Sequence, residues 1–274
     1  MTRGKLHDAF CSIGLKRGDQ AIVHSSLRAL GPLDGGAGAV VETLLDILGE
    51  DGLLVVPTFT YDSQRFDPST TPGRAGALSE WARHVPGAVR SRHPTHSVAA
   101  IGAGAAAFCA DHELRAATDL GTPLDRLAAS GGYVLLLGVG QASNTMVHVG
   151  EFHAAAFYLD IPFSPIWPRE HTIVDGDEVL HVAYDRFPGC SRAFGVVERG
   201  LRARGALRDG GIARAHAQLI PAAAIVEETV ALLADDPRAL LCSDPSCYRC
   251  VRARARIMGA PDVRARATEG DRGE

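Results

Sequence analysis

The stretch AIVHSSLRALGPLDGGAGAVVETLLDILGEDGLLVVPTF, residues 21–59, contains the pattern that decides the fold. It begins and ends with short apolar runs bounded by Ser, Gly and Pro, as buried strands are. Between them, GAVVETLLDILG has apolar residues at helical spacing and ends in Gly49, a natural C-cap. The stretch therefore predicts a strand, a helix and a second strand.

The same alternation continues along the chain. Four strands are predicted: Ala21–Ser26, Leu53–Phe59, Ser97–Gly102 and Tyr133–Val139. Helical spacing predicts further helices over Ala77–His84, Ala103–Asp111 and Ala223–Ala234. Alternating strands and helices indicate a layered α/β sandwich. No internal repeat or linker is evident, so we expect one α/β domain over residues 1–258. The Arg/Ala/Gly-rich residues 259–274 lack an apolar pattern and are expected to form a mobile tail.

Composition restricts the class of protein. Hydrophobic residues make up 46% of the 274 residues and charged residues 22%, which is typical of a folded globular chain. The sequence has neither an apolar run long enough to span a membrane nor a secretory signal over Met1–Gln20, so we expect a cytoplasmic protein. The formal net charge of −4 disfavours nucleic-acid binding and suits a cationic ligand.

Two polar segments beside the predicted strands could bind anions. VHSSLRALGPLDGG, residues 23–36, offers hydroxyls, backbone N–H groups and Arg28 before a helix, but it lacks the order of a Walker motif. RSRHPTHS, residues 90–97, contains two Arg and two His around Pro94 and could hold an anion or a nucleotide ring. A strand end with its turn, and a solvated basic loop, explain the two segments equally well.

NTMVHVGEF, residues 144–152, places His148 and Glu151 three residues apart, on one face if the segment is helical. A metal site, a catalytic pair and a plain helix surface would each explain the spacing. The HExxH order of helical zinc sites is absent, which disfavours metal. A histidine that takes a proton near neutral pH, with an acid that orients its ring, fits better.

Four of the six cysteines lie in two short motifs, FPGCSRAF around Cys190 and CSDPSCYRC over Cys242–Cys250. The terminal CxxC resembles a zinc half-site, which Cys190 or a histidine could complete. A disulfide is less expected in the cytoplasm, and a redox-active CxxC would need a thioredoxin-like strand before it, which is missing. Cys11 and Cys109 have the pattern of ordinary small buried residues.

Several of these motifs, taken in order, closely resemble the aminoglycoside 3-N-acetyltransferase family. The matching stretches are VHSSLRALGPLDGG, GLLVVPTFTYD, FDPSTTPGRAGALSEWARHVPGAVRSRHPTHSVAAIG and TPLDRLAASGGYVLLLGVGQASNTMVHVGE. The resemblance spans roughly residues 14–250. It implies the antibiotic N-acetyltransferase fold, a central mixed β-sheet flanked by helices, which is distinct from the GNAT superfamily. It also implies acetyl-CoA as donor and a cationic amine as acceptor, most often the 3-amine of 2-deoxystreptamine in an aminoglycoside, with antibiotic resistance as the result.

The resemblance also implies roles for individual residues. His148 would be the general base, and Glu151 would orient its ring, favour the imidazolium or bind a substrate ammonium. Thr145 would hydrogen-bond the thioester carbonyl. Contacts to CoA would come from Ser25, Ser26, Leu27, Arg28, Arg92, His93, Ser97 and Val98. Ammonium groups of the acceptor would meet Asp62, Asp67 and Asp185, the last also a possible partner of His148.

Three further expectations remain open at the level of the sequence. A structural Zn²⁺ held by Cys190, Cys242, Cys247 and Cys250 would fix the C-terminal segment, although His181 could replace one cysteine and the thiols could be unligated. An N-acetyltransferase for a non-aminoglycoside amine is the main alternative function. A catalytically inactive CoA-binding or zinc-stabilised interaction protein is the second.

Overall fold

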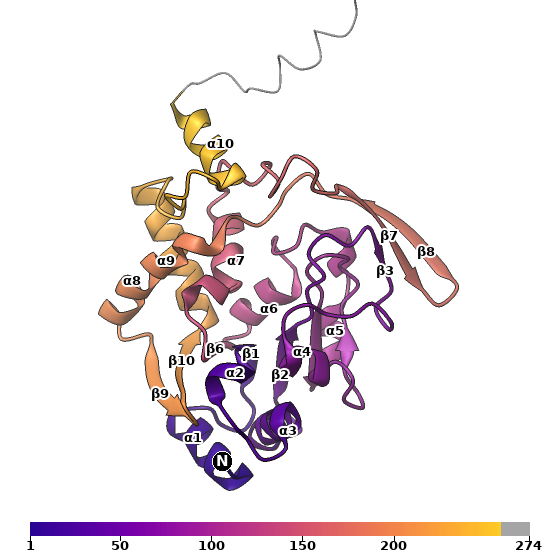
Figure 1. Cartoon of the computed structure of the whole chain (residues 1–274), viewed down its shortest axis with the longest axis vertical. Coiled ribbons are helices and arrows are strands. Elements are labelled where there is room, and N and C mark those ends of the chain that lie inside the picture. The colour runs from indigo at the N-terminus through magenta and orange to yellow at the C-terminus, as the bar shows by residue number, and fades with distance from the viewer. Residues whose placement is uncertain (259–274) are drawn as a thin grey trace, which may run out of the picture.

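A seven-stranded mixed sheet forms the middle layer of the molecule in the computed structural model, which describes residues 1–258 (Figure 1). Its spatial order is β4-β5-β2-β1-β6-β10-β9. Strand β1 pairs parallel with β2 and β6, and the other pairs are antiparallel. The strands are β1 (Gln20–Ser25), β2 (Leu53–Pro57), β4 (Val89–Arg90), β5 (Val98–Gly102), β6 (Tyr133–Leu137), β9 (Arg208–Ile212) and β10 (Ala215–Pro221).

Helices cover both faces of this sheet. The helices are α1 (Arg3–Ser12), α2 (Leu27–Leu30), α3 (Gly36–Leu48), α4 (Ala77–Ala82), α5 (Ala105–Cys109), α6 (Pro123–Ala129), α7 (Met146–His153), α8 (Val197–Ala203), α9 (Ala222–Asp235) and α10 (Tyr248–Ile257). Short 3-10 turns are η1 (His112–Leu114), η2 (Gln141–Ser143) and η3 (Ser191–Val196). One core cluster packs α1, α3 and α4 on the sheet, and a second packs α5 to α9 on the opposite face.

The two cores follow from the pleat of β1. Successive side chains of a strand point to opposite faces. Ala21 and Val23 accordingly belong to the cluster with α1 and α3, whereas Ile22 belongs to the cluster with α7 and α9. Because both faces are covered, the strand is apolar almost throughout, which made it recognisable in the sequence.

A smaller sheet, β3 (Arg65–Phe66), β7 (Glu170–Asp175) and β8 (Glu178–Ala183), lies beside the main one in the order β3-β7-β8. The β7–β8 hairpin extends away from the helical layers (Figure 1). Arg92 joins it to the body through Glu178, 2.8 Å away, and Asp175, 3.5 Å away.

The structure confirms the layered α/β sandwich and the four predicted strands to within two residues. It also confirms the helix that ends before Gly49 and the three further helices, of which α4 and α5 are shorter than predicted and α9 is one residue longer at each end. Gly49 is the C-cap of α3 with φ 67°, a left-handed value that favours glycine. The predicted mobile tail, 259–274, lies outside the described residues. Within residues 1–258, none of the helices combines the length and apolar character needed to cross a bilayer.

Candidate active site

Helix α7 carries His148 and Glu151, the predicted catalytic pair. A network of buried side-chain amides fixes the start of this helix. The side-chain carbonyl oxygen of Asn144 accepts a hydrogen bond from the Met146 N–H at 3.1 Å, as a helix-capping side chain does. The Asn144 amide donates in turn to Gln141, which donates to Gln218 on β10. The helix is thereby tied to the sheet at its first residue.

His148 and Glu151 face each other one helical turn apart, as predicted. Nδ1 of His148 lies 2.6 Å from Oε2 of Glu151, and the Glu151 side chain has no exposed surface. A carboxylate can only accept, so Nδ1 carries the proton and Nε2 has the lone pair that can take another. Phe194 packs edge-on against the imidazole, 4.7 Å between ring centroids, and limits its rotation.

Two further donors complete the surroundings of Glu151. The Tyr158 hydroxyl donates to Oε1 at 2.8 Å, and the Gly189 N–H donates to Oε2 at 2.8 Å. A Cβ at position 189 would lie 1.9 Å from Oε1, so a side chain there would displace the carboxylate. Burial and the neighbouring Glu151 charge raise the pKa of Tyr158, so its hydroxyl stays protonated and can donate. Both oxygens of the buried carboxylate thus accept hydrogen bonds from donors within the protein.

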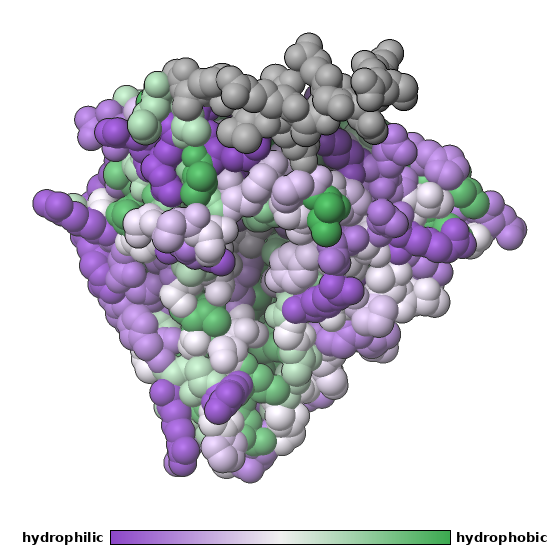
Figure 2. Space-filling view, turned by 45° about the horizontal axis from the view of Figure 1, so that its top comes forward, coloured by the Kyte–Doolittle hydropathy of each residue, from purple (hydrophilic) through white to green (hydrophobic). Residues whose placement is uncertain are grey.

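The imidazole of His148 lies in the wall of a cavity of about 420 Å³. Figure 2 shows one face of the molecule, which is hollowed in its middle between residues of mixed hydropathy. Ser25 and Thr145 line the same cavity, so the structure brings together three of the predicted site residues. The other lining residues include aromatic and hydroxyl side chains: Phe59, Tyr61, Phe163, Trp167, Ser143 and Ser191.

Two other histidines, His24 and His96, line this cavity and were not predicted as site residues. Burial, with a smaller contribution from the positive charge that His148 can carry, lowers the pKa of His24 to about 4. The same causes lower the pKa of His96 to about 3. Both rings are therefore neutral at pH 7, which avoids adding positive charge beside His148. His24 directly precedes Ser25 at the carboxyl end of β1, and that position was the available sequence signal.

The structure separates the predicted cofactor residues into two groups. Ser25 to Arg28 run from the end of β1 through α2, where the Ser26 hydroxyl accepts from the Ala29 N–H at 3.3 Å, and Arg28 is exposed. Of the first group only Ser25 lines the cavity. No member of the second group lines it, and each of them has a structural partner. Arg92 pairs with the β7–β8 hairpin, His93 stacks on Tyr184, Ser97 bonds Thr58, and Val98 pairs with Pro57.

The three predicted acceptor-binding acids also lie outside the cavity lining. Asp62 pairs with Arg74 at 2.9 Å, and Asp185 is exposed. Asp67 closes its own turn, where hydrogen bonds, first of all from the Ser69 hydroxyl, lower its pKa to about 2. Among the described residues the cavity wall contains no carboxylate, and Glu151 lies behind His148.

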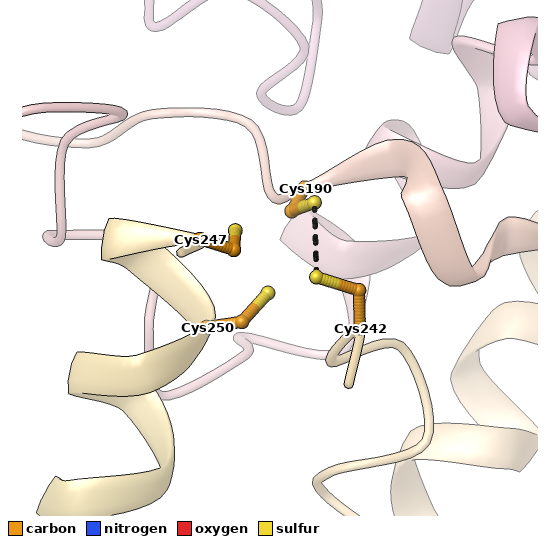
Figure 3. A group of neighbouring side chains, drawn as sticks. All are labelled: Cys190, Cys242, Cys247 and Cys250. Carbon is orange, nitrogen blue, oxygen red and sulfur yellow. Dashed lines mark hydrogen bonds between the residues drawn. The ribbon is translucent and has the colours of Figure 1, made fainter. Parts of the chain in front are cut away.

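The four predicted metal ligands form a second cluster. Cys247 and Cys250 come from the start of α10, Cys190 from the start of η3, and Cys242 from the loop after α9, and their side chains converge (Figure 3). All four sulfur atoms lie within 4.8 Å of one another, and those of Cys190 and Cys242 are 3.8 Å apart. Thiolates bound tetrahedrally to zinc at about 2.3 Å would be about 3.8 Å apart. The donor set therefore fits a closed zinc site, and His181, on β8, is not part of it.

The fold and the buried pair define a site of enzyme type, in which a histidine held by a carboxylate faces a cavity large enough for a small molecule. Comparison with known proteins specifies the chemistry. The family model described as aminoglycoside 3-N-acetyltransferase matches residues 22–234. The chain belongs to the aminoglycoside 3-N-acetyltransferase family, and it is an acyltransferase.

Individual relatives agree over most of the chain. Aminoglycoside N(3)-acetyltransferase VII of Streptomyces paromomycinus is 33% identical, over 84% of this chain and 91% of its own length. A crystal structure of a histidine-to-alanine mutant of aminoglycoside acetyltransferase AAC(3)-IVa in complex with a gentamicin has a TM-score of 0.81, with 30% identity over 92% of this chain and 96% of that one. AAC-IIIb in a binary complex with CoASH has a TM-score of 0.75, with 28% identity over 86% and 97% of the two chains.

Proposed function

We propose that this enzyme transfers the acetyl group of acetyl-CoA to the 3-amine of a 2-deoxystreptamine aminoglycoside, with His148 as general base. The observation that carries the proposal is the 2.6 Å contact between His148, which lines the cavity, and the buried Glu151 behind it. The complexes of two relatives with a gentamicin and with CoASH supply the substrate classes. Acetylation removes the positive charge of the amine, and we expect the modified drug to lose antibiotic activity.

The reaction needs a proton acceptor. The acceptor amine attacks the thioester carbonyl as a free base and becomes an ammonium. The C–S bond then breaks, and the proton that the ammonium loses to the base is passed to the sulfur, so that CoA leaves as thiol. Nε2 of His148 takes this proton directly or through one water, while Nδ1–H remains bonded to Glu151. Glu151 stabilises the imidazolium so formed. The Thr145 hydroxyl, in the wall beside the base, is the donor for the carbonyl oxygen as it becomes negative.

The two substrates would approach from opposite sides of this pair. The CoA arm fits the Ser25–Arg28 segment, where hydroxyls and an exposed guanidinium suit phosphates and amides. The acceptor fits the aromatic side formed by Phe59, Tyr61 and Trp167, because ring faces attract ammonium groups. Asp62, Asp67 and Asp185 remain proposed partners for additional ammonium groups of the acceptor. Of these, Asp62 is nearest in the sequence to the aromatic side, because it directly follows Tyr61.

An acceptor panel tests the proposal. Purified enzyme is incubated with acetyl-CoA and either 2-deoxystreptamine aminoglycosides or unrelated small amines, and release of CoA thiol is measured. We expect release with at least one aminoglycoside and an acetamide at the 3-position by NMR. His148→Ala should lower kcat by about 10²-fold or more while CoA affinity is kept. If only unrelated amines are acetylated, the drug-modifying function is overturned. If His148→Ala is fully active, His148 is not the general base.

We propose further that the four-cysteine cluster holds a structural Zn²⁺. The support is the convergence of Cys190, Cys242, Cys247 and Cys250 at distances that suit tetrahedral thiolate ligation. Four protein ligands leave no open position, so the metal would fix α10 to the rest of the chain and take no part in acetyl transfer.

A further inference from the structure

Arg249 is a buried cation in the middle of the CxxC motif, between Cys247 and Cys250. Its exposure is 1%, and it is among the largest fully buried side chains of the described chain. Arginine is rarely buried to this extent, because removing a charge from water costs several kcal/mol unless partners compensate. The partners of Arg249 therefore indicate what this cation does.

The guanidinium holds two loops that come from distant parts of the sequence. Its Nη2 donates to the carbonyl of Phe187 at 2.6 Å and to that of Tyr158 at 3.0 Å. The carbon of the guanidinium also lies 5.2 Å from the ring centre of Phe163, which lines the cavity. Arg249 therefore joins helix α10 to both loops at the rear of the catalytic cavity.

These loops supply the two donors that complete the surroundings of Glu151. In the first loop, Arg249 binds the carbonyl of Tyr158. The hydroxyl of the same residue donates to Oε1 of Glu151. In the second loop Gly189, two residues after Phe187, donates its N–H to Oε2. A shift of either loop would move a donor away from the carboxylate and release the ring of His148.

We propose that Arg249 is a positioning residue for the Glu151–His148 pair, which it aligns by fixing the Tyr158 hydroxyl and the Gly189 N–H on the two carboxylate oxygens. The inference rests on the proposed role of His148 as general base. The residue lies beyond the stretch matched by the family model, which ends at residue 234. A metal bound by the cysteines would hold the first turn of α10, and with it Arg249.

Arg249→Met tests the proposal, and Arg256→Met is the matched control. Arg256 lies on the same helix and donates to the Phe157 carbonyl at 2.7 Å, but it is exposed and pairs with Asp160. We expect Arg249→Met to lower kcat by about 10- to 100-fold with little change in KM for acetyl-CoA, since small misplacements of catalytic groups have effects of this size. The control should retain kcat within about two-fold.

A spectroscopic readout separates positioning from a general loss of structure. The His148 Nδ1–H in its short hydrogen bond should give a low-field proton resonance, assigned by its loss in His148→Ala. Arg249→Met should shift or broaden it, and Arg256→Met should not. Because this measurement needs no turnover, it tests Arg249 even if the wild-type enzyme acetylates no aminoglycoside, which would contradict only the proposed function.

Arg249→Lys and Tyr158→Phe keep the test decisive if the methionine variant does not fold. If Arg249 acts through Tyr158, the kcat losses of these two variants should be clearly less than additive in the double mutant. The proposal would be overturned if the kcat losses of the two variants were additive. It would also be overturned if Arg249→Met left both the resonance and kcat unchanged, or if added zinc restored its kcat. In the last case Arg249 would serve the cysteine cluster alone.

Discussion

Glu151 accepts hydrogen bonds from His148, Tyr158 and Gly189 and has no contact with solvent. Its role can be tested with Glu151→Gln, which keeps the size of the side chain and removes its charge. The amide leaves fewer acceptor sites for these donors and no anion to stabilise the imidazolium. We expect kcat to fall by about 10- to 100-fold with KM for both substrates nearly unchanged. An effect confined to the aminoglycoside KM would instead assign Glu151 to acceptor binding.

The spacing of His148 and Glu151 was enough to predict their contact, because residues three apart on a helix share a face. Tyr158 and Gly189 could not be predicted in the same way. Gly189 is 38 residues from Glu151 in the sequence and meets it only through the course of an irregular loop. The contacts of Arg92 and His93 within the protein could not be predicted either, because the partners of Arg92 lie on a hairpin about 85 residues further along the chain.

The position of α7 depends on its contact with α9. Gly150 lies against Thr229 of α9, and a Cβ added at Gly150 would lie 2.4 Å from the Thr229 Cβ. Gly150→Ala must therefore push the two helices apart, although alanine favours the helical state. We expect a loss of about 1–3 kcal/mol of unfolding free energy and a lower kcat, because His148 and Glu151 move with α7.

Gly4→Ala is the control for this prediction. Gly4 also lies in a helix, α1, but a Cβ there would meet no atom within 4 Å. The same substitution should leave stability unchanged or slightly increased at this position. If both variants unfold at the same denaturant concentration as the wild type, α7 and α9 are not in the close contact that the structure shows.

Elements differed in how well the sequence predicted them. The strands β1, β2, β5 and β6 are buried on both faces and read as continuous apolar runs. Strand β9, with the sequence RDGGI, has no such pattern and forms because β10 pairs with it at the edge of the sheet. Strand β8 is largely exposed and likewise was not predicted from the sequence. Pairing with a neighbour, rather than the strand's own residues, determines these edge elements.

At the scale of the whole molecule, the cysteine cluster would link α10 to the body of the enzyme. Metal analysis of protein purified without a metal-affinity tag should find about one zinc per chain. Cys247→Ser should lose this zinc together with thermal stability, because metal binding contributes directly to folding. Cys11→Ser is the control, since Cys11 is exposed and outside the cluster. Less than about a tenth of an equivalent of zinc, with unchanged melting of Cys247→Ser, would contradict the site.

Buried neutral histidines should make the whole fold sensitive to acid. Burial lowers the pKa of His24 and His112 to about 4 and that of His96 to about 3. In the unfolded chain these rings take up protons near pH 6.5, so between that pH and about 4 the unfolded state binds more protons than the folded state. The stabilisation is therefore complete above about pH 6.5 and is lost as the pH falls from there.

His112→Gln tests this prediction at one ring. His112 is held between the Ser91 hydroxyl, 2.8 Å from Nδ1, and the Ala117 carbonyl, 2.9 Å from Nε2, and a glutamine N–H can replace the second contact. Each buried ring contributes up to about 1.4 kcal/mol per pH unit to the slope of unfolding free energy against pH. Denaturant unfolding between pH 7 and 4.5 should give His112→Gln a slope smaller than that of the wild type by about this amount. Equal slopes in the wild type and His112→Gln would mean that His112 becomes protonated in the folded state as readily as in the unfolded chain.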